Sequence, residues 1–292
     1  MLLFHLTPKE NESLTGFFYR TARENLMDNL SWIEYNFAKF SGYQIRGNSL
    51  NWGDLKVVLD VSSFLNINQE DAIKMTFPYL LDFHGLKVDY DTKNKIKCPW
   101  FLYQTTKVCS LCVKEDPYHR MDWSFTYSTV CKKHKVFLID KCPSCDRDIN
   151  IKSVVNDKCV CEISISSSMI ETVNDHNIFE YQREVDKFFF NDTTVKVNNW
   201  ITNSFDFYNS LEFLATWLPQ TLDIDDIISI DGVKYSGNAI ARTRLKKSKT
   251  LQQACPLYLH SYLILKEWPN KFYDYINLIK NNNKENNKLH IF

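Results

Sequence analysis

Glycine is scarce in this chain: 7 of the 292 residues are glycine, and none lies in a G-x-G-x-x-G or G-x-x-x-x-G-K motif. Loops that cradle phosphate groups depend on such glycines. The scarcity argues against a nucleotide-binding enzyme of that kind and against a barrel. The sequence also lacks a run of about 18 apolar residues, the length that a membrane-crossing helix needs.

Excess charge of one sign is missing as well. The chain has 35 Lys and Arg residues against 35 Asp and Glu residues, a formal net charge of +0. Proteins that bind DNA strongly through its phosphates usually carry a basic excess. Any basic surface must therefore be local, and neutrality leaves room for a partner that is mainly protein.

Cysteine, by contrast, is abundant, and eight of the nine cysteines lie between Cys98 and Cys161. Two residues between ligands let both side chains point at one ion from a tight turn, and two such pairs close a four-ligand site. The stretch contains the pairs Cys109-x2-Cys112, Cys131-x2-His134, Cys142-x2-Cys145 and Cys159-x-Cys161.

The simplest pairing predicts two zinc sites, each with four protein ligands. The first consists of Cys109, Cys112, Cys131 and His134, and the second of Cys142, Cys145, Cys159 and Cys161. Four protein ligands leave no open position for water, so we expect two structural Zn²⁺ ions. The short Cys159-x-Cys161 pair makes the second site less typical. A disulfide-rich secreted protein is the alternative, but the odd cysteine count and the missing leader pattern disfavour it and favour the cytoplasm.

The first part of the chain shows helical periodicity. Ser13 is a suitable N-cap for a helix that starts at Leu14. Residues 52–65 and 69–77 predict two helices around the turn Asn66-Ile67-Asn68, ended by Pro78, which is helix-turn-helix spacing. Two packed core helices without a DNA role explain the pattern equally well. Glu70 and Asp71, in addition, would present like charge to phosphates at the start of the second helix.

Polar segments at 86–97 and 164–177 suggest the domain boundaries. We predict an N-terminal helix-turn-helix domain (1–95), a tandem zinc-binding region (96–165), a helical C-terminal domain (166–280) and a polar tail (281–292). The fold class is therefore mainly α with small zinc-ribbon β hairpins.

The remaining polar residues suggest binding and offer no catalytic constellation. One dense basic run is either a solvated face or a contact for a phosphate backbone. It consists of Arg242, Arg244, Lys246, Lys247 and Lys249. We find no Ser/His/Asp arrangement and no H-x-E motif near the zinc ligands, and we expect His119 to be a surface or core histidine because His134 completes the first site.

Four motifs resemble those of the TniQ family, target-selection proteins of transposons. They are Glu12-Ser13-Leu14 followed by Arg20, Tyr118-His119-Arg120 with Trp123, Thr129-Val130-Cys131-x2-His134, and Cys142-Pro143-x-Cys145. The likeness covers residues 2–165 and extends loosely over the remainder. The sequence departs from the family in lacking the usual glycine after Cys159-x-Cys161, which puts the geometry of the second site in doubt.

The resemblance implies a non-catalytic adaptor. Such a protein links a target site to an AAA+ transposition regulator. It finds the target by binding DNA directly or by docking, often as a dimer, on an RNA-guided CRISPR complex. It implies a bacterial protein that associates with the nucleoid when bound to DNA. The alternative is a sequence-specific zinc-containing DNA-binding protein, either a homing target selector or a transcription regulator.

Overall fold

The computed structural model describes residues 3–27, 29–86, 100–189, 194–197, 200–218, 227–230, 233–236 and 251–285. In this part the chain is mainly helical, and its short strands pair as antiparallel hairpins. Contacts separate two compact units, Met1–Asn191 and Asp192–Phe292, and each has buried apolar side chains of its own.

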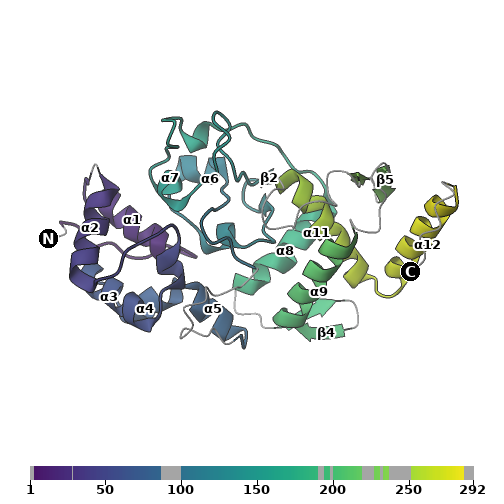
Figure 1. Cartoon of the computed structure of the whole chain (residues 1–292), viewed down its shortest axis with the longest axis horizontal. Helices are drawn as coiled ribbons and strands as arrows, with labels where there is room; N and C mark the ends of the chain where they lie inside the picture. The colour runs from purple at the N-terminus through teal and green to yellow at the C-terminus, as the bar shows by residue number, and fades with distance from the viewer. Residues whose placement is uncertain are drawn as a thin grey trace. The chain divides into compact units, whose positions relative to one another are not determined.

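The first unit contains short helices and one two-residue hairpin (Figure 1). The hairpin pairs Val130 with Phe137 and Cys131 with Val136. The α-helices and strands are α1 (Leu14–Glu24), α2 (Leu30–Ser41), α3 (Leu55–Leu65), α4 (Gln69–Lys74), α5 (Phe77–Phe83), α6 (Ser110–Glu115), β1 (Val130–Cys131), β2 (Val136–Phe137), α7 (Ile151–Val155) and α8 (His176–Asp186). Short 3₁₀ turns lie at Ser49–Trp52 (η1), Met121–Ser124 (η2), Ile165–Ser167 (η3) and Lys187–Phe189 (η4).

The second unit has longer helices and two described hairpins, β3–β4 and β5–β6. Its core joins Leu214 and Leu218 at the end of α9 to Ile264 of α11 and Tyr275 of α12. The elements are β3 (Thr194–Val197), β4 (Trp200–Asn203), α9 (Ser204–Trp217), β5 (Ile227–Ile230), β6 (Val233–Ser236), α11 (Leu251–Lys266) and α12 (Asn270–Glu285).

Local signals set several helix ends as the sequence predicts. The Ser13 hydroxyl accepts a hydrogen bond from the Gly16 amide and caps α1. Asn66 ends α3 in the left-handed conformation at φ 54°, and Asn68 caps α4 through the Glu70 amide. Pro78, however, lies in the first turn of α5 and starts a helix where we predict an end. The first turn of a helix tolerates proline because its amide has no intrahelical partner there.

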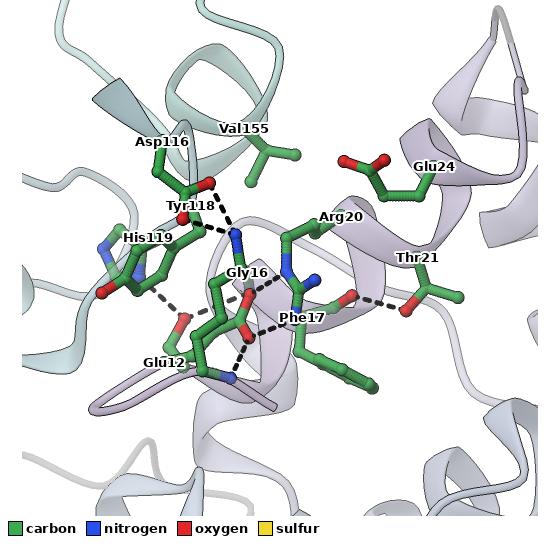
Figure 2. A network of polar contacts seen from close by, with 12 residues as sticks. Glu12, Gly16, Phe17, Arg20, Thr21, Glu24, Asp116, Tyr118, His119 and Val155 are labelled. Carbon is green, nitrogen blue, oxygen red and sulfur yellow. Dashed lines mark hydrogen bonds and ion pairs between the residues drawn. The ribbon is translucent and has the colours of Figure 1, made fainter. Parts of the chain in front are cut away.

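Helix α1 is enclosed by the rest of the first unit. Every residue from Leu14 to Ala22 is buried, so even the polar side chains of this helix are removed from water. Arg20 donates through Nε and Nη2 to the two carboxylate oxygens of Glu12, each at 2.7 Å (Figure 2). Nη2 also donates to the Thr7 carbonyl. Side-chain exposures of 5% and 0% place this bidentate pair in the interior, where an unpaired charge would be costly.

A buried histidine after α6 connects α1 to the segment that carries the first cysteines. His119 is buried, with Nδ1 2.7 Å from the Ser13 hydroxyl and Nε2 2.7 Å from the Thr106 hydroxyl. A Cβ on Gly16 would lie 2.9 Å from the His119 Cβ, so only glycine allows this approach. Of the two positions that we predict for His119, core or surface, the structure has the core position.

Helix α7 extends the same core from farther along the chain. Ile151 and Val155 pack among the apolar side chains of α1, α2 and α3. Arg23 Nη1 donates to the Pro117 carbonyl at 2.8 Å and to the Val155 carbonyl at 2.5 Å, which ties α1 to both segments. The helical part and the cysteine-rich part are therefore one body with one core.

The contacts divide the chain at one place, and the predicted domain boundaries stay a prediction. The predicted boundary at 95/96 lies outside the described residues, and the segments on either side of it share a core. At the predicted boundary 165/166, the serine-rich stretch instead pairs with the hairpin: Phe137 donates to Glu171 at 3.0 Å and Val173 to Lys135 at 2.8 Å. The observed division falls between Asn191 and Asp192.

The predicted polar tail overlaps the end of the last described helix. Helix α12 runs to Glu285, so the first residues of the range 281–292 are helical. Residues 286–292 lie outside the described residues.

Replacing Arg20 with methionine tests the enclosed ion pair. The substitution keeps most of the side-chain volume but leaves the Glu12 carboxylate buried without its cation. We expect the free energy of unfolding to fall by about 3–5 kcal/mol in a denaturant titration. Arg46→Met is the matched control, because Arg46 is exposed and forms no ion pair in the described residues, and it should change stability by less than about 0.5 kcal/mol. Equal effects of the two substitutions would contradict this account.

The buried His119 imidazole should make the stability of the protein depend on pH. Burial lowers the pKa of His119 to about 3, so the folded protein keeps it neutral while the unfolded chain takes up a proton below about pH 6.5. Stability from this group is therefore present above pH 6.5 and is lost as the pH falls. Between pH 7 and 5.5 the wild type should lose about 1 kcal/mol more unfolding free energy than His119→Gln. Parallel pH profiles for the two proteins would show that His119 is not held neutral.

Candidate metal centres

The first cluster is assembled from α6 and the β1–β2 hairpin. Cys109 lies at the N-cap of α6 and Cys112 lies within the helix, so one turn of backbone brings both thiols to the same side. Cys131 ends β1, and His134 follows in the turn before β2. Lys135 takes a left-handed φ of 55° and donates to the Cys131 carbonyl at 2.8 Å, which closes the turn.

The distances in this cluster fit a tetrahedral ion. The Cys112 and Cys131 sulfurs are 3.6 Å apart, and His134 Nδ1 lies 3.3 to 3.6 Å from the three sulfurs. A zinc ion with bonds of about 2.3 Å to sulfur gives a tetrahedron edge of about 3.8 Å. A disulfide needs about 2.05 Å between sulfurs. The four side chains therefore fit Zn²⁺ and are too far apart for a disulfide.

Glu115 supports the histidine of the first cluster from outside. Its Oε1 lies 3.0 Å from His134 Nε2, and its other oxygen accepts from Lys133. A carboxylate on the distal nitrogen orients a ligating imidazole and fixes which nitrogen faces the metal. Here it leaves Nδ1 for the ion. Our sequence reasoning missed Glu115, although its place three residues after Cys112 on α6 was a usable signal.

The second cluster uses two tight turns on either side of α7. Asp146 donates to the Cys142 carbonyl at 3.0 Å and has a φ of 55°, which folds the first pair into a turn. Glu162 donates to the Cys159 carbonyl at 2.9 Å with a φ of 69°. Glu162 thus adopts the left-handed conformation that glycine favours, at a cost of about 1–2 kcal/mol.

The sulfurs of the second cluster are arranged like those of the first. Cys142 lies 3.6 Å from Cys161, and Cys145 lies 3.6 Å from Cys159. All four ligand atoms lie within 4.8 Å of one another, as they do in the first cluster. Both clusters could therefore hold a metal ion, and the missing glycine does not prevent the sulfurs of the second from converging.

In each cluster one cysteine has a lowered pKa and is favoured as the thiolate, the form of cysteine that binds metal. Neighbouring thiols and burial raise the pKa of Cys109, Cys112 and Cys159. Hydrogen bonds from the Cys109 and Cys112 thiols lower the pKa of Cys131 to about 2. Burial raises the pKa of Cys142, but hydrogen bonds from the Cys145 and Ser144 amides outweigh this effect and lower it to about 7. With four protein ligands each, the residues would hold Zn²⁺ in closed, structural coordination.

The clusters differ in how deeply they are enclosed. The three cysteines of the first are buried and only His134 is half-exposed, whereas Cys145 and Cys161 of the second are both half-exposed. The second cluster is thus more open to solvent than the first.

The other predicted binding residues are not tested. Arg242, Arg244, Lys246, Lys247 and Lys249 lie outside the described residues, as does Cys98. Cys255 is buried in α11 of the second unit and belongs to neither cluster. Among the described residues, no helix is both long enough and apolar enough to cross a membrane.

Comparison with protein-family models shows that residues 3–138 match a family described as TniQ. The matched range begins before α1 and ends just after β2. It contains all four ligands of the first cluster and none of the second. A search of curated proteins finds no match.

Metal analysis of the purified protein tests both centres. We expect two zinc ions per chain, about one in Cys142→Ser, and two in the control Cys255→Ala, because Cys255 is in neither cluster. Zinc would be counted by mass spectrometry after gel filtration. A wild-type value near one would leave only the first centre, and a value of zero would refute both.

Proposed function

Because residues 3–138 belong to the TniQ family, we propose that this protein is a non-catalytic adaptor in transposition target selection. It would link a recognised target site to an AAA+ transposition regulator. The family match supports the general role in target selection. The link to the regulator, and the identity of the target complex, are the proposal.

The family match over α1 to β2, together with the closed ligand set it contains, carries this proposal. A catalytic zinc needs a coordination position for water or substrate, and neither cluster leaves one if all four side chains bind. The metal would supply folding free energy, on the order of 10–16 kcal/mol per structural site at neutral pH. Its role is to hold surfaces in place.

The contacts around α1 suggest how an adaptor would keep its surfaces in register. His119 and Arg23 connect α1 to the segment between the two ligand pairs of the first metal centre, and Arg23 also connects it to α7. A partner bound to α2 or α3 and another bound near the hairpin would meet one rigid unit. The second unit would offer separate helical surfaces.

Two routes to the target remain within the proposal. The protein could bind DNA directly, or it could dock, as a monomer or a homodimer, on a CRISPR effector complex with guide RNA. The alternative function, a sequence-specific DNA-binding protein, draws support from the α3–α4 pair with its Asn66 turn. It is weakened by the exposed Glu70 and Asp71 in the first turn of α4, where a recognition helix would meet phosphates.

A transposition assay with purified or co-expressed components tests the adaptor. We expect target-directed insertion to be lost without this chain, restored by the wild type and by Cys255→Ala, and not restored by Cys131→Ser. A tagged wild-type chain should retain the AAA+ regulator in a pull-down, and CRISPR subunits as well if targeting is RNA-guided.

Two results would count against the adaptor. Target-directed insertion that proceeds without the chain would refute it. Retention of neither the regulator nor CRISPR subunits, combined with a footprint of the chain alone on one DNA sequence, would favour the alternative.

A further inference from the structure

The turn of the first metal centre carries a concentration of positive charge. Lys132, Lys133 and Lys135 occupy three of the four positions after Cys131, and all three are exposed. Lys114, also exposed, comes from α6 and precedes Glu115, which contacts Lys133. These four lysines, here called the knuckle patch, come from two elements that the first cluster holds together.

Two of the four lysines of the patch have no carboxylate partner among the described residues. Lys9, Lys152 and Lys158 each pair with a carboxylate, at Asp116, Glu34 and Glu162 respectively. Within the patch, Lys133 pairs with Glu115, and Lys132 approaches Asp186 only to 3.9 Å. Lys114 and Lys135 form no ion pair within the described residues. Positive charge therefore remains available to a partner.

The backbone under the patch is fixed. Ligands flank the lysines at Cys131 and His134, and the Lys135 carbonyl accepts from the Val173 amide at 2.8 Å. Like charges held close together repel, and an anion placed over them relieves that repulsion. Because the backbone is already ordered, binding would cost less conformational entropy than binding by a flexible basic run.

We propose that the knuckle patch contacts the phosphate backbone of a polynucleotide. Lysine is a compact cation that neutralises phosphates without reading base sequence, so the contact would contribute affinity and register but not sequence specificity. A local patch of this kind is compatible with a chain whose net charge is +0. The inference rests on the proposed function, since target selection brings the protein to DNA or to a guide RNA.

The test uses the purified full chain and the variant Lys114→Ala/Lys132→Ala/Lys135→Ala. Lys133 is left in place because it contacts Glu115, which supports His134. Binding to a duplex DNA and to a duplex RNA of equal length would be measured at several salt concentrations. The slope of log K against log salt should fall in magnitude by about 2–3 for the preferred duplex, at about 0.9 per phosphate contact.

Matched variants distinguish an effect of the patch lysines on binding from an effect of total charge or of misfolding. Lys→Arg at the same three positions should retain the slope, and zinc content should be unchanged in both triple variants. Lys56→Ala/Lys74→Ala removes two exposed lysines of α3 and α4 that form no ion pair with the part of the chain that the structure describes. It should leave the slope nearly unchanged. Preference for DNA or for RNA would identify the source of the phosphates.

Two outcomes would overturn the inference. In the first, the wild type and the triple alanine variant bind equally well and Lys56→Ala/Lys74→Ala does not bind. The interface would then lie on α3 and α4. The other is a wild type that binds neither duplex. Neither outcome touches the adaptor function if the AAA+ regulator is still retained, so failures of the two proposals can be told apart.

Discussion

The bidentate pair between Glu12 and Arg20 is the constraint on which the first unit depends. Helix α1 is surrounded by other segments, and a helix in that position normally presents apolar residues on every side. Arg20 is tolerated because both carboxylate oxygens and a carbonyl oxygen satisfy it. Enclosure of α1 in turn brings the segment after α6 against it, through His119. The metal-binding part therefore packs against the helical part as an interior layer.

The β1–β2 hairpin would depend in turn on a bound metal ion. Strands of two residues provide too few ladder hydrogen bonds to be stable alone. Three kinds of contact would make up for the missing ladder hydrogen bonds. They are metal binding by Cys131 and His134, the backbone pairing with the serine-rich stretch, and the hydrogen bonds that Gln182 of α8 accepts from the Thr129 and Val130 amides. Ligand binding energy at this hairpin would thus also stabilise the packing of α8.

Local chemistry explains which features could be predicted from the sequence. The caps Ser13 and Asn68 and the left-handed Asn66 depend on side chains within three residues, and the ligand spacing depends on one turn of backbone. Features set by distant segments could not be predicted. No residue near Gly16 in the sequence predicts that His119 will pack against it. The serine-rich stretch looks like a linker because its backbone amides, rather than its side chains, make the pairing.

The position of α7 has a consequence for how this protein could be shortened or recombined. The helix lies in sequence between the two cysteine pairs of the second cluster, yet Ile151 and Val155 complete the core around α1. The segment that matches the family ends at residue 138, before this helix. A fragment cut there would leave apolar surface on α1 and α2 uncovered, together with Glu34, which pairs with Lys152. A fragment that keeps this core complete must therefore extend beyond the segment that matches the family.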